Sequence, residues 1–212
     1  MGWFSSICSS VSSFVSSAAS SFGGAIGSAI SAISPMLGMG ISVIGKVANI
    51  AQGVMQGLGL FKPNENTEEM GDRMIQAADG GIKPEGYDKF DDYMAEIRSR
   101  KLDPEKSKET PLEVKQSAGI ALSTMALEDK FKGTTNIEDI WLLYAKNPDY
   151  FNAEKLTSVM STFKDIKSIS DYLDGKANVK DAMTTEKTLF DIEKSASPDR
   201  DDKSIYDELR KM

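Results

Sequence analysis

The first 61 residues constrain this chain most, because they contain a single charged side chain, Lys46, and no acidic residue. The stretch is rich in serine, glycine, alanine and aliphatic side chains. A soluble protein that left so much apolar surface in water would aggregate, so lipid or other protein surfaces must cover it. We therefore predict an apolar arm over residues 1–61 that associates with itself or acts on membranes.

The first part of the arm has the pattern of an amphipathic helix. Between Phe4 and Ile33 the large apolar residues recur every three or four positions, which places them on one helical face. The opposite face is nearly all serine, a mediocre helix former, so this helix needs neighbours to be stable. The face predicted to pack against lipid or a partner consists of Phe4, Ile7, Val11, Phe14, Phe22, Ile26, Ile30 and Ile33.

The second part of the arm, residues 36–61, follows Pro35, which ends or kinks the first helix. Its apolar side chains lie nearly all round a helix, and its length reaches the ~20 residues that a bilayer core requires. Glycine and several polar residues make it a poorer membrane span than a leucine-rich segment. Small residues spaced four apart favour close helix contact, and the glycines predicted to serve in this way are Gly23, Gly27, Gly53 and Gly57.

The rest of the chain predicts a conventional acidic helical body. At residues 62–66 the composition changes from nearly uncharged to highly charged, and we interpret this stretch as a hinge. Residues 67–212 hold nearly all the charge of a chain whose net charge is −7. Capping residues, prolines and glycines predict the helices, and no useful alternating β-pattern is present. The expected fold is all-α, with the two-segment arm attached to a bundle of helices at about 66–78, 87–101, 110–132, 136–147, 152–175, 178–195 and 201–211.

The composition argues against several classes of function. Histidine is absent, which removes the commonest general base and the commonest zinc ligand. Cys8 is the single cysteine, so no intrachain disulfide can form. An acidic surface repels phosphate backbones, so no specific nucleic acid is predicted as a partner. We expect no catalytic site, no cofactor and no metal, and therefore not an enzyme.

One resemblance follows from these residues. The Ser/Ala/Gly-rich apolar stretch from Trp3 to Ile30, joined to a histidine-free acidic helical remainder, resembles the small internal virion proteins of tailed bacteriophages. Such ejection or pilot proteins are stored in the particle and enter the host envelope with the DNA. The stretch also resembles, more loosely, the membrane-active N-termini of some eukaryotic virus minor capsid proteins.

The resemblance to ejection proteins implies a non-enzymatic structural protein of the virion. Its arm would pack against other copies of itself and other virion proteins, then meet host membrane lipid and aid genome ejection. The implied location is the virion, and the host cell envelope after infection. Two alternatives stay open: a purely structural tail or connector protein whose arm is buried in protein, and a holin-like membrane protein.

Overall fold

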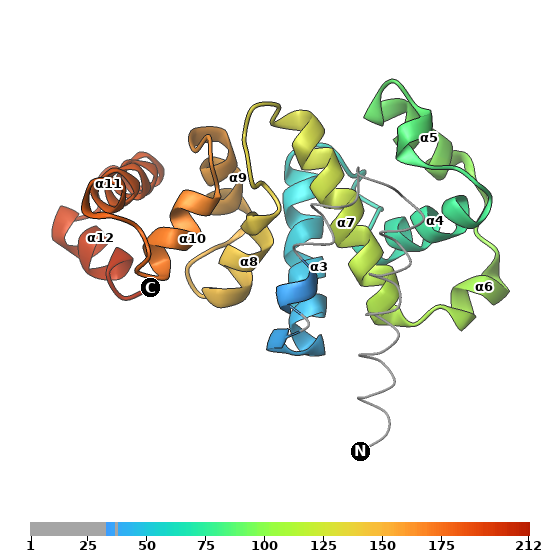
Figure 1. Ribbon diagram of the computed structural model, residues 1–212, viewed down its shortest axis with the longest axis horizontal. Coiled ribbons are helices and arrows are strands. Elements are labelled where there is room, and N and C mark those ends of the chain that lie inside the picture. Colours follow the sequence, from blue (N-terminus) through green and yellow to red (C-terminus); the bar gives the residue numbers. More distant parts are fainter. Residues whose placement is uncertain (1–32, 37) are drawn as a thin grey trace, which may run out of the picture. The chain divides into compact units, whose positions relative to one another are not determined.

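A computed structural model describes residues 33–36 and 38–212, and within these residues the chain is helical without a β-strand (Figure 1). The all-α prediction is confirmed for this part of the chain. Most of the predicted packing face, from Phe4 to Ile30, lies outside the described residues, as do Gly23 and Gly27. The chain forms two compact units, which divide after Lys130.

The described part of the first unit is built around one central helix. Helix α7 is buried at every position from Ser117 to Leu127, so it has no solvent-facing side there. Helix α4 makes the most extensive contact with it, and α3 packs against both. The elements of this unit are α3 (Ile41–Gly57), α4 (Thr67–Asp79), the 3₁₀ turn η2 (Pro84–Gly86), α5 (Phe90–Ser99), α6 (Pro104–Glu109) and α7 (Leu112–Lys130).

Helix α3 brings the second segment of the predicted arm into this folded unit. Its apolar face is buried, and Ile33 and Met36 upstream of it are fully buried as well. The compact units therefore do not divide at residues 62–66, where the sequence predicts a hinge between arm and body. The reason is that α7 supplies an apolar surface on which α3 buries Ile44, Val47, Ala48, Ala51, Val54 and Met55.

The second unit places α11 at its centre, in contact with α9, α10 and α12. The predicted single helix over residues 152–175 is wrong, because the chain leaves the helix between Phe163 and Ile166. There the N–H of Thr135 donates to Lys164 O at 2.8 Å, and its carbonyl accepts from the N–H of Ile166 at 3.1 Å. The helices are α8 (Asp139–Lys146), α9 (Ala153–Thr162), α10 (Lys167–Leu173), α11 (Val179–Ala196) and α12 (Asp202–Leu209).

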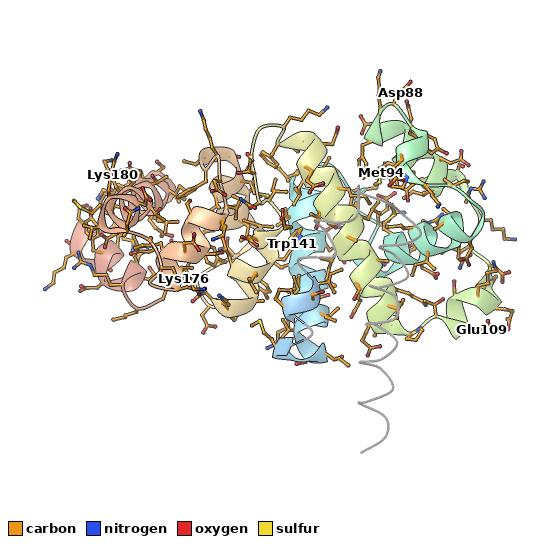
Figure 2. The ribbon with its side chains drawn as sticks, viewed as in Figure 1. Asp88, Met94, Glu109, Trp141, Lys176 and Lys180 are labelled. Atoms are coloured by element: carbon orange, nitrogen blue, oxygen red, sulfur yellow. The ribbon has the colours of Figure 1, made fainter. Side chains whose placement is uncertain are left out.

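Local capping explains where several helices begin. The side chain of Asn66 accepts a hydrogen bond from the N–H of Glu69 at 2.8 Å, as the sequence predicts for the start of α4. Helix α6 was not among the predicted helices, although Asp103 caps it and Pro104 occupies its first position. Figure 2 labels Met94 and Trp141, which are buried, and the exposed charged residues Asp88, Glu109, Lys176 and Lys180.

Candidate functional site

The contact between α4 and α7 depends on two glycines that face each other's helix. A Cβ atom added at Gly71 would lie 1.9 Å from the carbonyl oxygen of Lys115. One added at Gly119 would lie 1.9 Å from the carbonyl oxygen of Thr67. Both obstacles are backbone atoms, so no side chain can move aside. The two helices touch main chain to main chain, and only glycine fits at these two positions.

Buried polar groups flank this crossing. The Thr67 hydroxyl donates to the carbonyl of Ala48 at 2.8 Å, which joins the start of α4 to α3. The buried Asp72 carboxylate accepts from Ser107 Oγ at 2.5 Å and from Gln76 Nε2 at 3.0 Å. These bonds satisfy polar atoms that would otherwise be costly to bury, so the arrangement stabilises the unit.

Gly71 and Gly119 were not among the predicted close-packing glycines, and the predicted Gly57 does not pack closely against the described residues. Gly57 is exposed, and within the described residues an added Cβ there would meet no atom within 4 Å. Gly53 is half-buried. Gly71 and Gly119 were missed, although a lone glycine inside a helical pattern is itself a sign of close backbone approach. The four-residue spacing could not single out Gly71 and Gly119, because it takes no account of a partner helix.

Residues 62–66 are held against α5 by a buried ion pair. Arg98 Nε and Nη2 donate to the two carboxylate oxygens of Glu65 at 2.8 and 2.9 Å, and Nη2 also reaches Leu60 O at 2.8 Å. The N–H of Lys62 donates to Glu65 Oε2 at 2.8 Å. Burial raises the pKa of Glu65, but these hydrogen bonds outweigh it and hold the pKa below its ordinary value.

In the second unit a buried carboxylate, Glu193, is the centre of a charged cluster. Its side chain is 4% exposed, with Lys155 Nζ 2.6 Å from Oε1 and Arg200 Nη1 2.9 Å from Oε2. The ammonium group of Lys155 also lies 3.8 Å from the centre of the Tyr150 ring. The cluster joins α9, α11 and the segment before α12. A buried charge of this kind needs its partners, so the role we infer for it is structural.

Tyr150 completes this cluster. Burial is the main cause that raises the pKa of its hydroxyl, and a hydrogen bond to Glu193 raises the pKa further. The phenol therefore stays protonated across the physiological range, where it serves as a donor to the carboxylate.

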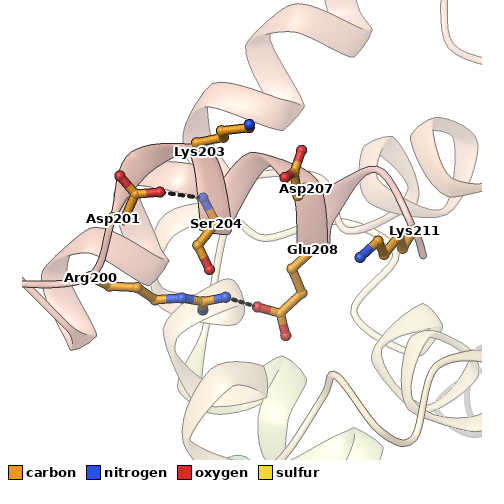
Figure 3. Close-up of a pocket in the computed structure, with 7 residues that line it drawn as sticks. All are labelled: Arg200, Asp201, Lys203, Ser204, Asp207, Glu208 and Lys211. Carbon is orange, nitrogen blue, oxygen red and sulfur yellow. Dashed lines mark hydrogen bonds and ion pairs between the residues drawn. The ribbon is translucent and has the colours of Figure 1, made fainter.

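The surface hollow beside α12 is lined by side chains of both charges (Figure 3). Arg200 pairs with Glu208, and the Asp201 carboxylate accepts from the N–H of Ser204 at 2.9 Å, which caps α12. Arg200, Glu208 and Asp201 are thus engaged with each other or with the end of the helix. These contacts within the protein account for three of the charged side chains that line the hollow.

A second hollow, in the first unit, has a basic lining that includes Arg73, Arg100 and Lys106. Arg73 Nη1 donates to the carbonyls of Arg98 and Arg100 at 3.3 and 2.7 Å, at the end of α5. Lys106 lies 3.6 Å from Asp79, and Arg100 lies 3.1 Å from Glu96. These cations neutralise carboxylates and a helix C-terminus, so the hollow is a poor anion site.

A third hollow, a groove of about 490 Å³ between α9 and α11, has a different character. Five of its eight lining residues are serine or threonine. The hydroxyls of Thr157, Ser161, Thr162 and Ser195 donate to backbone carbonyls four residues earlier, at 2.7 to 2.8 Å. The one charged side chain in the lining, Asp191, pairs with Lys187 at 2.5 Å. Four of the five hydroxyls in the groove are therefore already bonded within their own helices.

Within residues 33–36 and 38–212 no three metal-ligating side chains come together as a metal site. None of the helices in that part of the chain is both long and apolar enough to cross a bilayer. Comparisons with protein families, with curated proteins and with solved structures find no match for this chain.

Proposed function

We propose that this chain is a non-enzymatic viral structural protein carried in the virion, whose uncharged N-terminal segment packs in the particle and then enters the host envelope to aid genome ejection. The observation that supports the proposal is the way the segment continues into the fold. Ile33, Met36 and α3 are buried in protein, whereas residues 1–32 carry no charge at all. A folded acidic body thus holds an uncharged segment of 32 residues.

The structure narrows the part of the arm that is available for this role. Because α3 buries its apolar face on α7 and α4, residues 41–57 contribute to the body's own core. Inserting these residues into a membrane would require the first unit to open, and the unit would then lose the core contacts that α3 makes. The proposal therefore assigns the packing and insertion to the region before Ile33.

The test is a dye-release assay with full-length protein and phospholipid vesicles. We expect release by the wild type, and loss of release when Val11→Glu puts a charge on the apolar face. Ser12→Glu is the matched control, because its neighbouring position falls on the serine face, where a charge stays in water. Inert wild-type protein, or equal activity in both variants, would reject membrane insertion.

The strongest alternative is a tail or connector protein whose arm packs only against protein. The burial of α3 in protein favours it. Its expected signature is an ordered oligomer in detergent-free buffer together with no binding to vesicles. A holin-like protein would instead make cells leaky when expressed alone. Detecting the chain in purified particles, with its copy number, separates the virion proposals from the holin-like one.

A further inference from the structure

We propose that residues 100–110 form a strap that opens and closes on α4 while helices α3, α4 and α7 stay packed together. The strap joins α5 to the start of α7 and contains the short helix α6, which Figure 1 shows at the margin of the first unit. The inference concerns how this unit opens, so it goes beyond the proposed function and does not depend on it.

The strap contributes no buried side chain to the core. Every residue from 100 to 110 is exposed or half-buried, and Leu102 is its only large aliphatic side chain. Helices α3, α4 and α7, in contrast, bury apolar side chains against one another. Because burial of apolar surface is the main source of folding stability, detaching the strap leaves that source in place.

Hydrogen bonds from two side chains of α4 hold the strap. Gln76 Oε1 accepts from the N–H of Asp103 at 2.8 Å, and Gln76 Nε2 donates to Asp103 O at 3.3 Å and to Ser107 Oγ at 3.1 Å. Ser107 Oγ donates in turn to the Asp72 carboxylate at 2.5 Å. Such bonds are exchanged for bonds to water when the strap lifts, so each contributes only modestly to closure.

The underside of the strap is not closely packed. The basic hollow of the first unit, of about 130 Å³, lies between α4 and the strap, and its lining comes from these two segments alone: Arg73, Gln76, Ala77, Arg100, Lys101, Leu102, Asp103 and Lys106. The bond from Arg73 Nη1 to Arg100 O, at 2.7 Å, is an exposed one. The pair between Lys106 and Asp79, at 3.6 Å, is exposed on both sides and adds little.

Opening the strap would change the surroundings of one buried carboxylate. Asp72 is 3% exposed, and the oxygen that accepts from Ser107 also lies 3.8 Å from the ammonium of Lys115 on α7. Asp72 follows Gly71, which meets the backbone of Lys115 at the crossing of α4 and α7. Lifting the strap therefore lets water reach an ion pair beside that crossing. In this proposal the strap is the first part of the unit to open, and it opens before α4 separates from α7.

Hydrogen–deuterium exchange of the full-length protein, followed by NMR, tests the proposal. The N–H of Asp103 is the probe, because its acceptor is the side chain of Gln76 on α4. After correction for intrinsic rates, we expect it to exchange roughly a hundredfold faster than the amides of residues 117–127 in α7. Equal protection at the two places would mean that the strap opens only with the whole unit, which overturns the proposal.

Ser107→Ala then asks whether the strap moves as one piece. It removes the bond to Asp72 but leaves the bond between Asp103 and Gln76, and alanine favours helix within α6. We expect exchange at Asp103 to rise about two- to tenfold, with α7 unchanged, because one closing bond is lost. Simple fraying of α6 would instead leave Asp103 as it was, which rejects a strap that opens as a unit.

The matched control is Lys108→Ala, which breaks the exposed pair with Glu105 inside α6 and touches no group on α4. We expect no change at Asp103 in this variant. A rise as large as that of Ser107→Ala would show that the contact with Asp72 does not hold the strap. Faster exchange throughout α7 in Ser107→Ala would also reject the proposal, since the core would then be opening together with the strap.

Discussion

The carboxylate of Glu65 and the guanidinium of Arg98 form a two-bond ion pair, at 2.8 and 2.9 Å, between the segment after α3 and helix α5. Glu65 is 7% exposed, so this pair lies largely out of water. Gln56 on α3 adds a bond from Nε2 to Glu65 O at 2.9 Å. The stretch that the sequence marks as a hinge is thus fixed to the helices on both sides of it.

Replacing this carboxylate should weaken the first unit. We expect Glu65→Gln to lower the free energy of unfolding by about 2 kcal/mol near neutral pH, since it removes charge-assisted hydrogen bonds from Arg98. The folded pKa lies below the ordinary value of 4.5, so the native state binds this proton more weakly than the unfolded chain. The stabilisation is therefore present above about pH 4.5 and is lost as the pH falls through the folded pKa.

Urea unfolding at several pH values measures this effect. The difference between wild type and Glu65→Gln should be largest near neutral pH and should shrink on acidification. The control is Glu96→Gln, which breaks the exposed pair with Arg100 and should cost less than about 0.5 kcal/mol. A pH-independent difference would show that the ion pair is not its source.

The two glycines of the α4–α7 crossing should tolerate no side chain. We expect Gly71→Ala and Gly119→Ala each to destabilise the protein by about 3 kcal/mol, because the new methyl group meets backbone and forces the helices apart. Thermal or urea unfolding followed by circular dichroism gives the free energies.

Gly57→Ala is the matched control for that series. It lies at the end of α3 with space around it in the described structure, so alanine should stabilise the helix by about 0.5–1 kcal/mol. If Gly57→Ala proved as harmful as the other two, the crossing would not be the special contact that the geometry indicates.

The hydroxyl of Ser117 is buried in α7, and among the described residues it has no hydrogen-bond partner. We expect Ser117→Ala to raise the free energy of unfolding by about 0.5–1 kcal/mol, because an unpaired buried hydroxyl is costly and alanine favours helix. Ser123→Ala is the comparison, since that hydroxyl donates to Gly119 O at 2.8 Å. Its replacement should bring no gain, and an equal gain at both positions would point to helix propensity alone.

The charged cluster of the second unit should depend on Glu193. We expect Glu193→Gln to cost about 3 kcal/mol, because Lys155 and Arg200 would lose their buried counter-charge. On the same helix, Asp191→Asn removes an exposed pair with Lys187 and should cost less than about 0.5 kcal/mol. Fluorescence of Trp141 in a Trp3→Phe background reports the unfolding of this unit. Similar losses of unfolding free energy in the two variants would contradict the idea that the buried pair matters more than the exposed one.

Much of the fold could be predicted from local signals. Asn66 and Asn152 each cap a helix with their side chains, as the sequence indicates, because a cap depends only on residues two or three positions away. The break at residues 163–166 could not be predicted in this way. It exists because Thr135, nearly thirty residues earlier, offers its backbone to Lys164 and Ile166. The sequence alone does not reveal such a distant partner.

The candidate surfaces were harder to predict for the same reason. A small-residue spacing marks Gly53 and Gly57, whereas among the described residues Gly71 and Gly119, on different helices, meet the backbone of the facing helix. The groove between α9 and α11 likewise exists only once the two helices are paired. A one-dimensional pattern shows which residues could allow contact, and it is the pairing of helices that decides which of them do.

The burial of α3 against α7 has a consequence for biosynthesis. Helix α3 leaves the ribosome about 55 residues before α7 begins, so its apolar face waits for the helix that covers it. At ordinary translation speeds this interval is roughly 3 to 11 seconds. During that time the nascent chain exposes an aggregation-prone, nearly uncharged stretch, residues 1–61. We therefore expect chaperones that bind apolar segments to associate with this nascent chain before its first unit closes.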